Sequence, residues 1–520
     1  MSKQTFLKGT LILIAAGMIT RVLGFINNIV LARFVGPEGV GLYRMAVPTL
    51  VLAITITQCG LPVAISKLVA EAEAEKDQQK VKKILVVSLS ITGGLSLIIT
   101  PLMIILAPLI SSTLLTDERT LYPLLAISPV VPIVAVSSVL RGYFQGKQNM
   151  KPAAYSQVLE QIVRISLIAL LTNMLYPFGI EYAAAGAMIS SVIGEAVSFV
   201  YLWFSFKRKK KMQIRKNFFA SAKKGKATFA SLMEVALPTT GSRMIGSIAW
   251  FFEPVVVAQS LALTGITAVM ATRQYGELSG YALPLLMLPS FITYSLSTSL
   301  VPAISEAMAK KNHQLVEHRL RQALRLSIVT GGLAVLVLYL FAEPLMTAMY
   351  GNNDAAGLVK LMAPFFIFQY IQGPLQAVLQ ALNLAKAAMF NSLIGAAAKT
   401  GMIFLLASRP SLGITGAALA ITAGIMLVTL LHLATVMKVI SMSIYAKDYL
   451  YSFFAIILTG AVSHYACTLF FSKLPSVSSL LLSICLTSLI YLLLLMLFKL
   501  VSLEELRRVP LFGKWIGAKK

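Results

Sequence analysis

The sequence predicts an all-α polytopic membrane protein with about fourteen transmembrane helices. Three observations indicate this class. Of the 520 residues, 57% are hydrophobic and only 12% are charged. Apolar runs of about 20 residues, long enough to cross a bilayer, recur along the whole chain. Lys and Arg concentrate in alternate connections between these runs, as the positive-inside rule describes.

The apolar runs form two sets of six and a final pair. The first set makes a predicted N-terminal lobe, 1–206, with helices near 6–35, 40–69, 84–110, 120–144, 153–176 and 181–206. The second set makes a predicted C-terminal lobe, 229–440, with helices near 230–257, 278–307, 323–348, 357–383, 387–408 and 413–437. The final pair, near 447–471 and 476–499, lies in a segment 441–500. A basic cytoplasmic connector, 207–228, joins the lobes, and a cytoplasmic tail, 501–520, follows the final pair.

Basic residues orient the predicted spans. The groups around Lys76, Lys147 and the run Lys207 to Lys211 lie in alternate connections, whereas the loop at Asp117 to Arg119 carries little positive charge. We therefore expect both termini on the cytoplasmic side of the cell membrane. The net charge of +25 has the same origin and does not indicate nucleic acid. The run after the sixth helix serves as a topology anchor, with anionic lipid head groups as a second interpretation.

The chain repeats itself with six helices per copy. Leu61 to Ser66 returns as Val301 to Ser305, and each copy precedes a charged cytoplasmic loop. Farther on, Val139-Leu140-Arg141 is answered by Val378-Leu379-Gln380 at nearly the same offset. An even number of helices per copy makes the copies parallel, related by an axis along the membrane normal. Two such lobes around a central cavity are typical of alternating-access transporters.

The cysteines and histidines carry no enzymatic signature. Cys59, Cys467 and Cys485 lie within apolar runs, and the four histidines form no ligand pattern. We therefore expect no metal site, no cofactor, no catalytic residues and no disulfide framework.

The first predicted helix carries one small and polar face. Gly17, Arg21, Gly24 and Asn28 recur at helical spacing, so they share that face, with Arg21 at its centre. A cation at membrane depth is costly unless it faces water or a partner. The face predicts a polar cavity in which Arg21 and Asn28 hold an anionic cargo. The alternative is an arginine whose ion pair only fixes helix packing.

The seventh predicted helix opens the second lobe with a comparable face. Arg243 and Glu253 lie on it, and Arg243 corresponds to Arg21 in predicted depth. Two guanidinium groups facing one cavity suit a phosphate or diphosphate, because each makes paired hydrogen bonds. An ion pair of Arg243 with Glu253 or Glu277 is an equally good interpretation.

Other charged residues are weaker candidates. Arg44 and Arg273 lie near the predicted outer ends of the second and eighth helices, where they guide cargo or extend toward head groups. In the fifth helix, Glu160 and Arg164 are four positions apart, which favours self-pairing. The candidates for proton or cation coupling are Glu195, Glu253 and Glu277.

Several longer runs carry a resemblance to a known family. Thr20 to Phe25 and Ser297 to Pro302 resemble motifs of bacterial lipid II flippases and polysaccharide exporters, which belong to the multidrug/oligosaccharidyl-lipid/polysaccharide exporter superfamily. Leu140 to Met150 and Gln372 to Gln380 are similar to members from endospore-forming bacteria. The resemblance implies two six-helix lobes around a cationic cavity, and two extra helices that form a groove for a polyprenyl tail. It also implies that Arg21 matches the family's essential first-helix arginine.

The function implied by the resemblance is a flippase for a polyprenyl-diphosphate-linked peptidoglycan precursor in spore cortex synthesis. The expected partners are this lipid-linked sugar and membrane lipid. The runner-up is a cation-coupled exporter of drugs or small amphiphiles on the same fold. A membrane glycosyltransferase or ligase is disfavoured because the predicted outer loops are short. A scaffold for cell-wall synthesis proteins is a further alternative.

Overall fold

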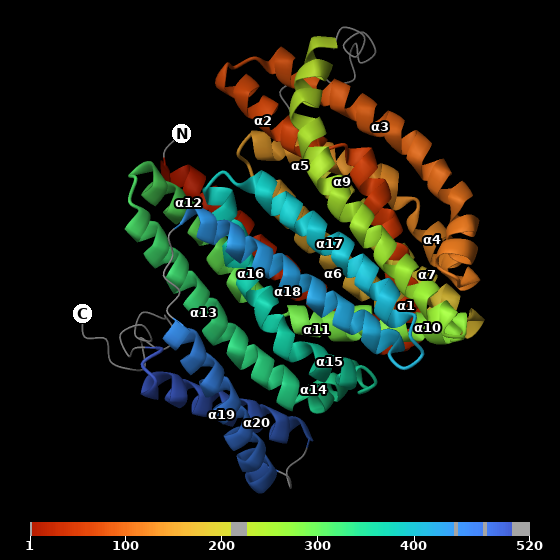
Figure 1. The fold of residues 1–520 in the computed structure, drawn as a ribbon. Coiled ribbons are helices and arrows are strands. Elements are labelled where there is room, and N and C mark those ends of the chain that lie inside the picture. Colours follow the sequence, from red (N-terminus) through yellow and green to blue (C-terminus); the bar gives the residue numbers. More distant parts are fainter. Residues whose placement is uncertain (1–2, 210–225, 441–445, 472–475, 502–520) are drawn as a thin grey trace. The chain divides into compact units, whose positions relative to one another are not determined.

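The computed structural model describes residues 3–209, 226–440, 446–471 and 476–501, and all regular secondary structure in these ranges is helical (Figure 1). Most of the predicted connector and nearly all of the predicted tail lie outside the described residues. Within these described ranges, eleven helices are long and apolar enough to cross a membrane, or twelve if one bent pair counts as a span. The all-helical polytopic class is therefore confirmed.

The difference between twelve and the fourteen predicted spans comes from two places. The stretch Ala16–Ala74, counted as one span, covers the first two predicted helices, which meet at the non-helical Gly36. The predicted helix 357–383 appears as α15 (Ala356–Met362), a 3-10 turn (Ala363–Phe365) and α16 (Phe366–Ala381), and this segment is not among the spans that are long and apolar enough. Pro364 lies in the turn, where a missing backbone N–H and a fixed φ interrupt the α-helical pattern.

The segment α1 (Lys3–Gln58) consists of two helices that meet at Gly36. Gly36 is non-helical, and an L side chain adopts its φ of 73° only with strain. Pro37 follows directly and has no N–H to donate to the preceding turn. The predicted boundary after residue 35 therefore corresponds to a junction between two helices. A second break, at Cys59 and Gly60 before α2 (Leu61–Ala74), was not predicted.

Two compact units make up the chain. Unit 1 contains residues 1–281 and 400–417, and unit 2 contains 282–399 and 418–520. Besides α1 and α2, unit 1 holds α3 (Gln78–Leu109), α4 (Leu121–Ile127), α5 (Val130–Gly146), α6 (Lys151–Leu175), α7 (Ile180–Lys209), α9 (Lys226–Leu263) and α10 (Ala268–Gly276). Thus α9 and α10, which open the predicted second lobe, pack with helices of the first. The lobe boundaries themselves stay a prediction.

Unit 2 begins at the last residue of a π-helical turn, Glu277–Ala282, that continues α10. Its helices are α11 (Leu283–Met287), α12 (Ser290–Ala309), α13 (His313–Leu340), α14 (Ala342–Tyr350), α15, α16, and the greater part of α17 (Ala385–Ala407) and α18 (Gly413–Val439). The last two helices are α19 (Ala446–Phe471) and α20 (Ser476–Leu497). Pro289 lies between α11 and α12, where the eighth predicted helix is bent.

The segments that repeat in sequence pack in the same way within their own units. In unit 1, Ile65 of α2 belongs to one buried cluster with Leu140 of α5. In unit 2, Ile304 of α12 belongs to a second cluster with Leu379 of α16. The repeated motifs therefore each build a small core at one helix-helix contact, which explains why both copies keep the same apolar spacing.

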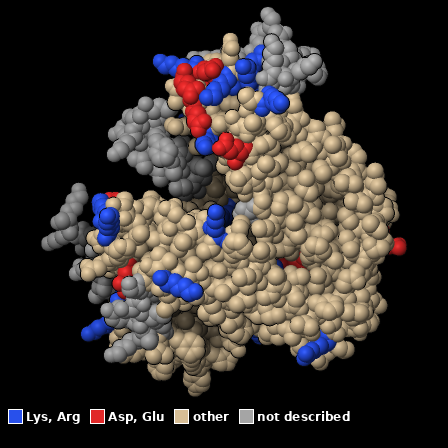
Figure 2. Space-filling view, turned by 45° about the horizontal axis from the view of Figure 1, so that its top comes forward, with Lys and Arg blue, Asp and Glu red and all other residues tan. Residues whose placement is uncertain are grey.

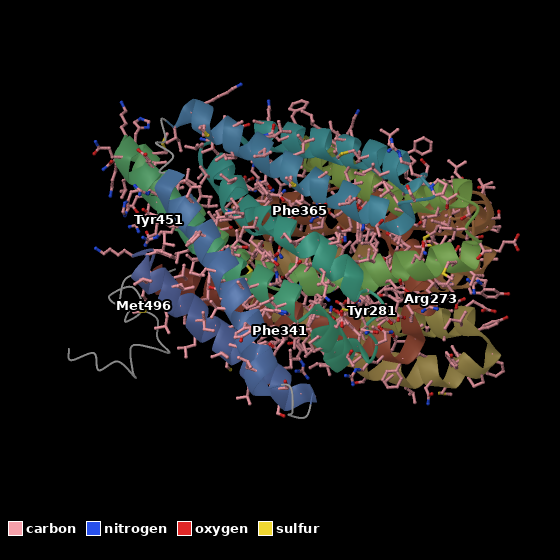
Figure 3. All side chains as sticks on the ribbon, turned by 60° about the horizontal axis from the view of Figure 1, so that its bottom comes forward. Arg273, Tyr281, Phe341, Phe365, Tyr451 and Met496 are labelled. Atoms are coloured by element: carbon pink, nitrogen blue, oxygen red, sulfur yellow. The ribbon has the colours of Figure 1, made fainter. Side chains whose placement is uncertain are left out.

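The α19–α20 pair packs on α13 within unit 2. Ala455, Tyr491 and Leu495 bury against Leu336, and the rings of Tyr451 and Phe498 stack with centroids 5.8 Å apart. Tyr451, near the start of α19, and Met496, near the end of α20, are labelled in Figure 3.

Apolar side chains cover much of the molecular surface. Leu97 and Ile105 of α3 are 77% and 72% exposed, and Leu497 of α20 is 72% exposed. Most of the face in Figure 2 carries no charge, and charged side chains gather in a few patches. A water-facing surface of this kind would be unfavourable, whereas hydrocarbon chains of a bilayer cover it at no such cost.

Candidate functional site

Arg44 and Asn28 meet inside unit 1, where the two parts of α1 approach the end of α10. The Nη2 atom of Arg44 donates a hydrogen bond to Oδ1 of Asn28. Asn28 is only 5% exposed, and its Nδ2 atom donates to the carbonyl oxygen of Gly280 at 2.7 Å. The amide of Asn28 thus connects the guanidinium of Arg44 to the π-helical turn. Two of the predicted binding residues are brought together.

The π-helical turn explains how a backbone carbonyl becomes available to Asn28. Carbonyls in such a turn lose their usual partner four residues on. A second hydrogen bond lies close by. The hydroxyl of Tyr281 donates to the carbonyl oxygen of Ala32 of α1 at 2.9 Å. Tyr281 and Arg273 are both labelled in Figure 3, from the same segment. The turn is therefore held to α1 by two side-chain hydrogen bonds.

Glu253 of α9 is buried near the same place. It is 7% exposed, and the buried phenol of Tyr275 in α10 lies within the electrostatic reach of both Glu253 and Arg44. Three predicted residues, Asn28, Arg44 and Glu253, therefore belong to one polar interior where α1, α9 and α10 meet. We call Asn28, Arg44, Glu253 and Tyr275 together the polar interior.

Arg21 and Arg243 differ from this group because both are exposed on their helices, α1 and α9. Arg273 is 44% exposed and forms an ion pair with Glu277, Nε to Oε1, at 3.1 Å. Glu277 is one of the two acids that the sequence offers as a partner for Arg243. The structure gives Glu277 another basic partner, four positions away on its own helix.

Glu195 lies in a second buried group of charges, apart from the polar interior in sequence. Its two carboxylate oxygens accept hydrogen bonds from Nη2 of Arg141 at 3.0 and 3.2 Å. The same nitrogen lies 3.5 Å from Glu160, which also pairs with Arg164 at 2.5 Å. The predicted pairing of Glu160 with Arg164 is thus confirmed, and two more charges join it. We call these four residues of α5, α6 and α7 the buried ion network.

Sequence reasoning missed the role of Arg141 as the partner of Glu195. Arg141 is notable in the sequence only because the corresponding position of the second copy of the repeat is Gln380. The change from a cation to an amide between copies is a usable signal, because a charge present in one copy alone needs a local counter-charge.

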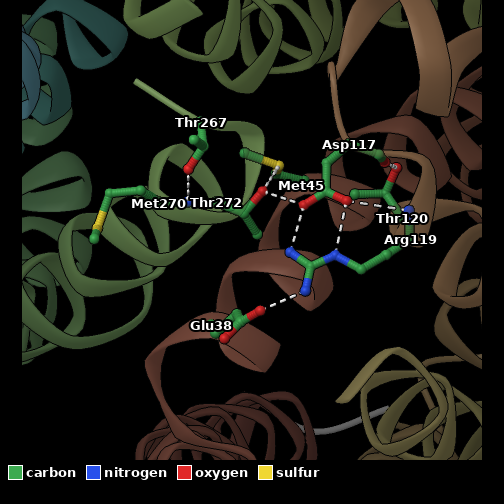
Figure 4. Close-up of polar contacts among 8 residues, drawn as sticks. All are labelled: Glu38, Met45, Asp117, Arg119, Thr120, Thr267, Met270 and Thr272. Carbon is green, nitrogen blue, oxygen red and sulfur yellow. Dashed lines mark hydrogen bonds and ion pairs between the residues drawn. The ribbon is translucent and has the colours of Figure 1, made fainter. Parts of the chain in front are cut away.

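A third polar group, also missed, surrounds Asp117 in the loop before α4 (Figure 4). Asp117 is 4% exposed and accepts hydrogen bonds from Nη2 of Arg119 at 2.8 Å and from the hydroxyl of Thr272 at 2.6 Å. Arg119 in turn pairs with Glu38 through Nη1. Burial alone would raise the pKa of Asp117, but the hydrogen bonds from Arg119 and Thr272 lower it below its ordinary value. This loop acid therefore stays ionised.

Comparison with protein-family models identifies two matches. Residues 6–308 match the family described as "Polysaccharide biosynthesis protein", and residues 248–405 match "MatE". The first match covers more than half of the chain.

Curated relatives from Bacillus subtilis (strain 168) agree with these matches. The chain is 63% identical to stage V sporulation protein B, over 99% of this chain and all of that protein. It is 30% identical to sporulation protein YkvU, over 85% of this chain and 97% of that protein. It is 24% identical to lipid II flippase MurJ, over 76% of each chain.

Solved structures share the fold. A lipid II flippase MurJ in an inward closed conformation superposes with a TM-score of 0.71 at 16% identity, covering 93% of this chain and 98% of that one. An inward-facing multidrug resistance MATE family transporter of the MOP superfamily gives 0.64, covering 81% and 94%. These two structures are described as a flippase and a multidrug resistance transporter. The chain is a multi-pass membrane protein, and it belongs to the polysaccharide biosynthesis protein family of transporters related to MurJ.

Proposed function

We propose that the chain moves a polyprenyl-diphosphate-linked peptidoglycan precursor, or a related sugar-lipid, across the cytoplasmic membrane during spore cortex synthesis. It does so by alternating access, with both termini in the cytoplasm. The 63% identity to a sporulation protein and the relation to a lipid II flippase support this proposal. No covalent chemistry is needed, since cargo is bound on one side and released on the other.

The observation that carries the proposal is the guanidinium of Arg44 in the polar interior. One of its nitrogens is engaged by Asn28, while its buried Nε has no hydrogen-bond partner among the described residues. A guanidinium binds a phosphate best through two parallel N–H donors. Arg44 therefore retains donor capacity for an anion, and Asn28 orients the group from behind.

Arg21 and Arg243 extend the same chemistry. Both are exposed on spanning helices, which is costly in hydrocarbon but favourable beside water or an anionic cargo. In the proposed cycle Arg21 and Arg243 attract the diphosphate, and Arg44 then binds it at the polar interior. The α19–α20 pair supplies an apolar groove for the polyprenyl tail, consistent with its exposed leucine and phenylalanine side chains.

The test is reconstitution into vesicles with a labelled lipid-linked precursor, followed by measurement of its movement between leaflets. Arg21→Ala and Arg44→Ala should each abolish flipping, and Arg44→Lys should restore only part of it because paired donors are lost. Arg409→Ala is the matched control, since Arg409 is an exposed arginine in the turn before α18. Full flipping by both alanine variants would refute the proposal.

A second candidate, a cation-coupled exporter of small amphiphiles, is favoured by the buried ion network. Glu195 is a coupling candidate that is only 4% exposed, and its ion-pair partner Arg141 comes from another helix, α5. A proton on Glu195 would release Arg141 from its strongest contact. This candidate would be favoured if the protein does not flip the sugar-lipid but a proton gradient drives its efflux of a cationic dye.

A further inference from the structure

The group around Asp117 joins three segments that are far apart in sequence. Asp117 lies in the loop between α3 and α4, Glu38 lies just after the kink of α1, and Thr272 lies in α10. The carboxylate of Asp117 accepts four hydrogen bonds: from the hydroxyl of Thr272 and from the backbone N, Nε and Nη2 of Arg119. Figure 4 shows these contacts converging on one carboxylate.

Close backbone packing between α1 and α10 lies beside this group. A Cβ atom built on Gly41 would lie 2.0 Å from the carbonyl oxygen of Thr272. A Cβ atom on Gly276 would lie 2.0 Å from the carbonyl oxygen of Pro37. Both distances are impossible for real side chains, so the two helices touch backbone to backbone. The hydrogen bond from Thr272 to Asp117 therefore acts at the point where α1 and α10 are closest.

The segments belong to different copies of the predicted repeat. Glu38, Asp117 and Arg119 come from the first copy, whereas Thr272 comes from the second. If the two copies move against each other during transport, this contact has to break and form again. A threonine hydroxyl on a carboxylate suits such a contact, because it stabilises the closed arrangement without the desolvation of a second buried charge.

We propose that Asp117, Arg119, Glu38 and Thr272 form a latch that holds α1 and α10 together at the end predicted to face outside, and that the latch has to open before cargo is released. The inference rests on the proposed alternating access. Arg119 and Glu38 hold Asp117 in place, and Thr272 is the member that leaves. The latch sets how often the outer end opens, and it does not touch the cargo.

The test measures opening directly, without cargo. Ser279, half-buried in the π-helical turn and further along the chain than Thr272, is replaced by cysteine in a background that lacks Cys59, Cys467 and Cys485. Intact cells are treated with a membrane-impermeant maleimide, and its rate of reaction with S279C is followed.

The latch variants are Thr272→Val, which keeps the branched shape and removes only the hydroxyl, and Asp117→Asn. Glu118→Gln is the matched control, because Glu118 is the exposed acid next to Asp117 in the same turn. Each variant is checked for a single peak by size-exclusion chromatography. If Asp117→Asn fails to fold, Thr272→Val decides.

We expect the labelling rate to rise about tenfold in the latch variants, in line with loss of a hydrogen bond to a charged group, and to stay unchanged in Glu118→Gln. An unchanged rate in a folded Thr272→Val variant would overturn the latch. Faster labelling in a protein that does not flip the sugar-lipid would keep the latch and remove the proposed function. Normal flipping with unchanged labelling would keep the proposed function and remove the latch.

Discussion

Replacement of Arg141 by glutamine tests the buried ion network most directly. Glutamine is the residue that the repeat places at the corresponding position, Gln380, so the change is compatible with the local helix packing. In the structure, Nη2 of Arg141 lies 3.0 Å from Glu195, 3.1 Å from Ser198 and 3.5 Å from Glu160. The substitution removes all of these contacts to the cation at once.

The expected loss of stability follows from the charges that remain. With Arg141 present, two guanidinium groups face two carboxylates. Without it, Arg164 still pairs with Glu160, but Glu195, which is 4% exposed, loses the guanidinium of Arg141. Removal of one partner from a buried ion pair costs about 3–5 kcal/mol, chiefly because the other charge stays buried without compensation. We expect Arg141→Gln to lower the free energy of unfolding by about that amount.

The assay is denaturant unfolding in detergent micelles, followed by tryptophan fluorescence, on a double-mutant cycle. The cycle contains Arg141→Gln, Glu195→Gln and the double variant. Because Glu195→Gln removes the charge that Arg141 compensates, the double variant should be less destabilised than the sum of the single variants. Arg208→Gln, at the exposed end of α7, is the control for loss of an arginine.

Two results would refute this reasoning. The first is a loss for Arg141→Gln within about 0.5 kcal/mol of the control, the range of ordinary surface substitutions. The second is additivity of the two single variants to within about 0.5 kcal/mol, which is expected of residues that do not interact.

Three further predictions address packing, pH and topology. Gly276→Ala should destabilise the protein, because the new Cβ would lie 2.0 Å from a backbone oxygen, whereas Gly246→Ala, with no neighbour within 4 Å, should be neutral or slightly stabilising in thermal unfolding. Since the pKa of Asp117 is lowered below 3.8 in the folded protein, its contribution to stability is fully present from pH 8 down to pH 5 and is lost only as the pH falls through that lowered value. The other charged groups that face Asp117 are Arg119 and Glu38. A labelling rate of S279C that is already higher at pH 6 would contradict this expected pH dependence of stability. A reporter fused after Arg119 should appear outside the cell and one fused after Lys211 inside, and the opposite result at either site would overturn the predicted orientation.

The helical class and most spans could be predicted because hydropathy is a local property of the sequence. A run such as 181–206 is apolar whatever surrounds it, and it appears as α7 (Ile180–Lys209). The bounds fail where backbone geometry decides. Cys59 and Gly60 interrupt the run predicted as the helix 40–69, and Pro364 divides a run that hydropathy alone treats as one helix.

Partners across the fold could not be predicted from spacing. Glu160 and Arg164 are four apart on one helix, so helical geometry alone pairs them. Arg141 and Glu195 are separated by 54 positions, and only the packing of α5 against α7 brings them together. Asp117 belongs to a charged outer loop in the sequence, and nothing in its neighbours shows that this loop acid is buried.

The π-helical turn at 277–282 also constrains the length of the chain at this point. Such a turn contains one residue more than an α-helical turn, and each added residue rotates the subsequent backbone by about 100°. Deletion of a single residue at the start of the turn would therefore rotate the carbonyl of Gly280 away from Asn28. Insertions and deletions in this turn should therefore be rare among relatives.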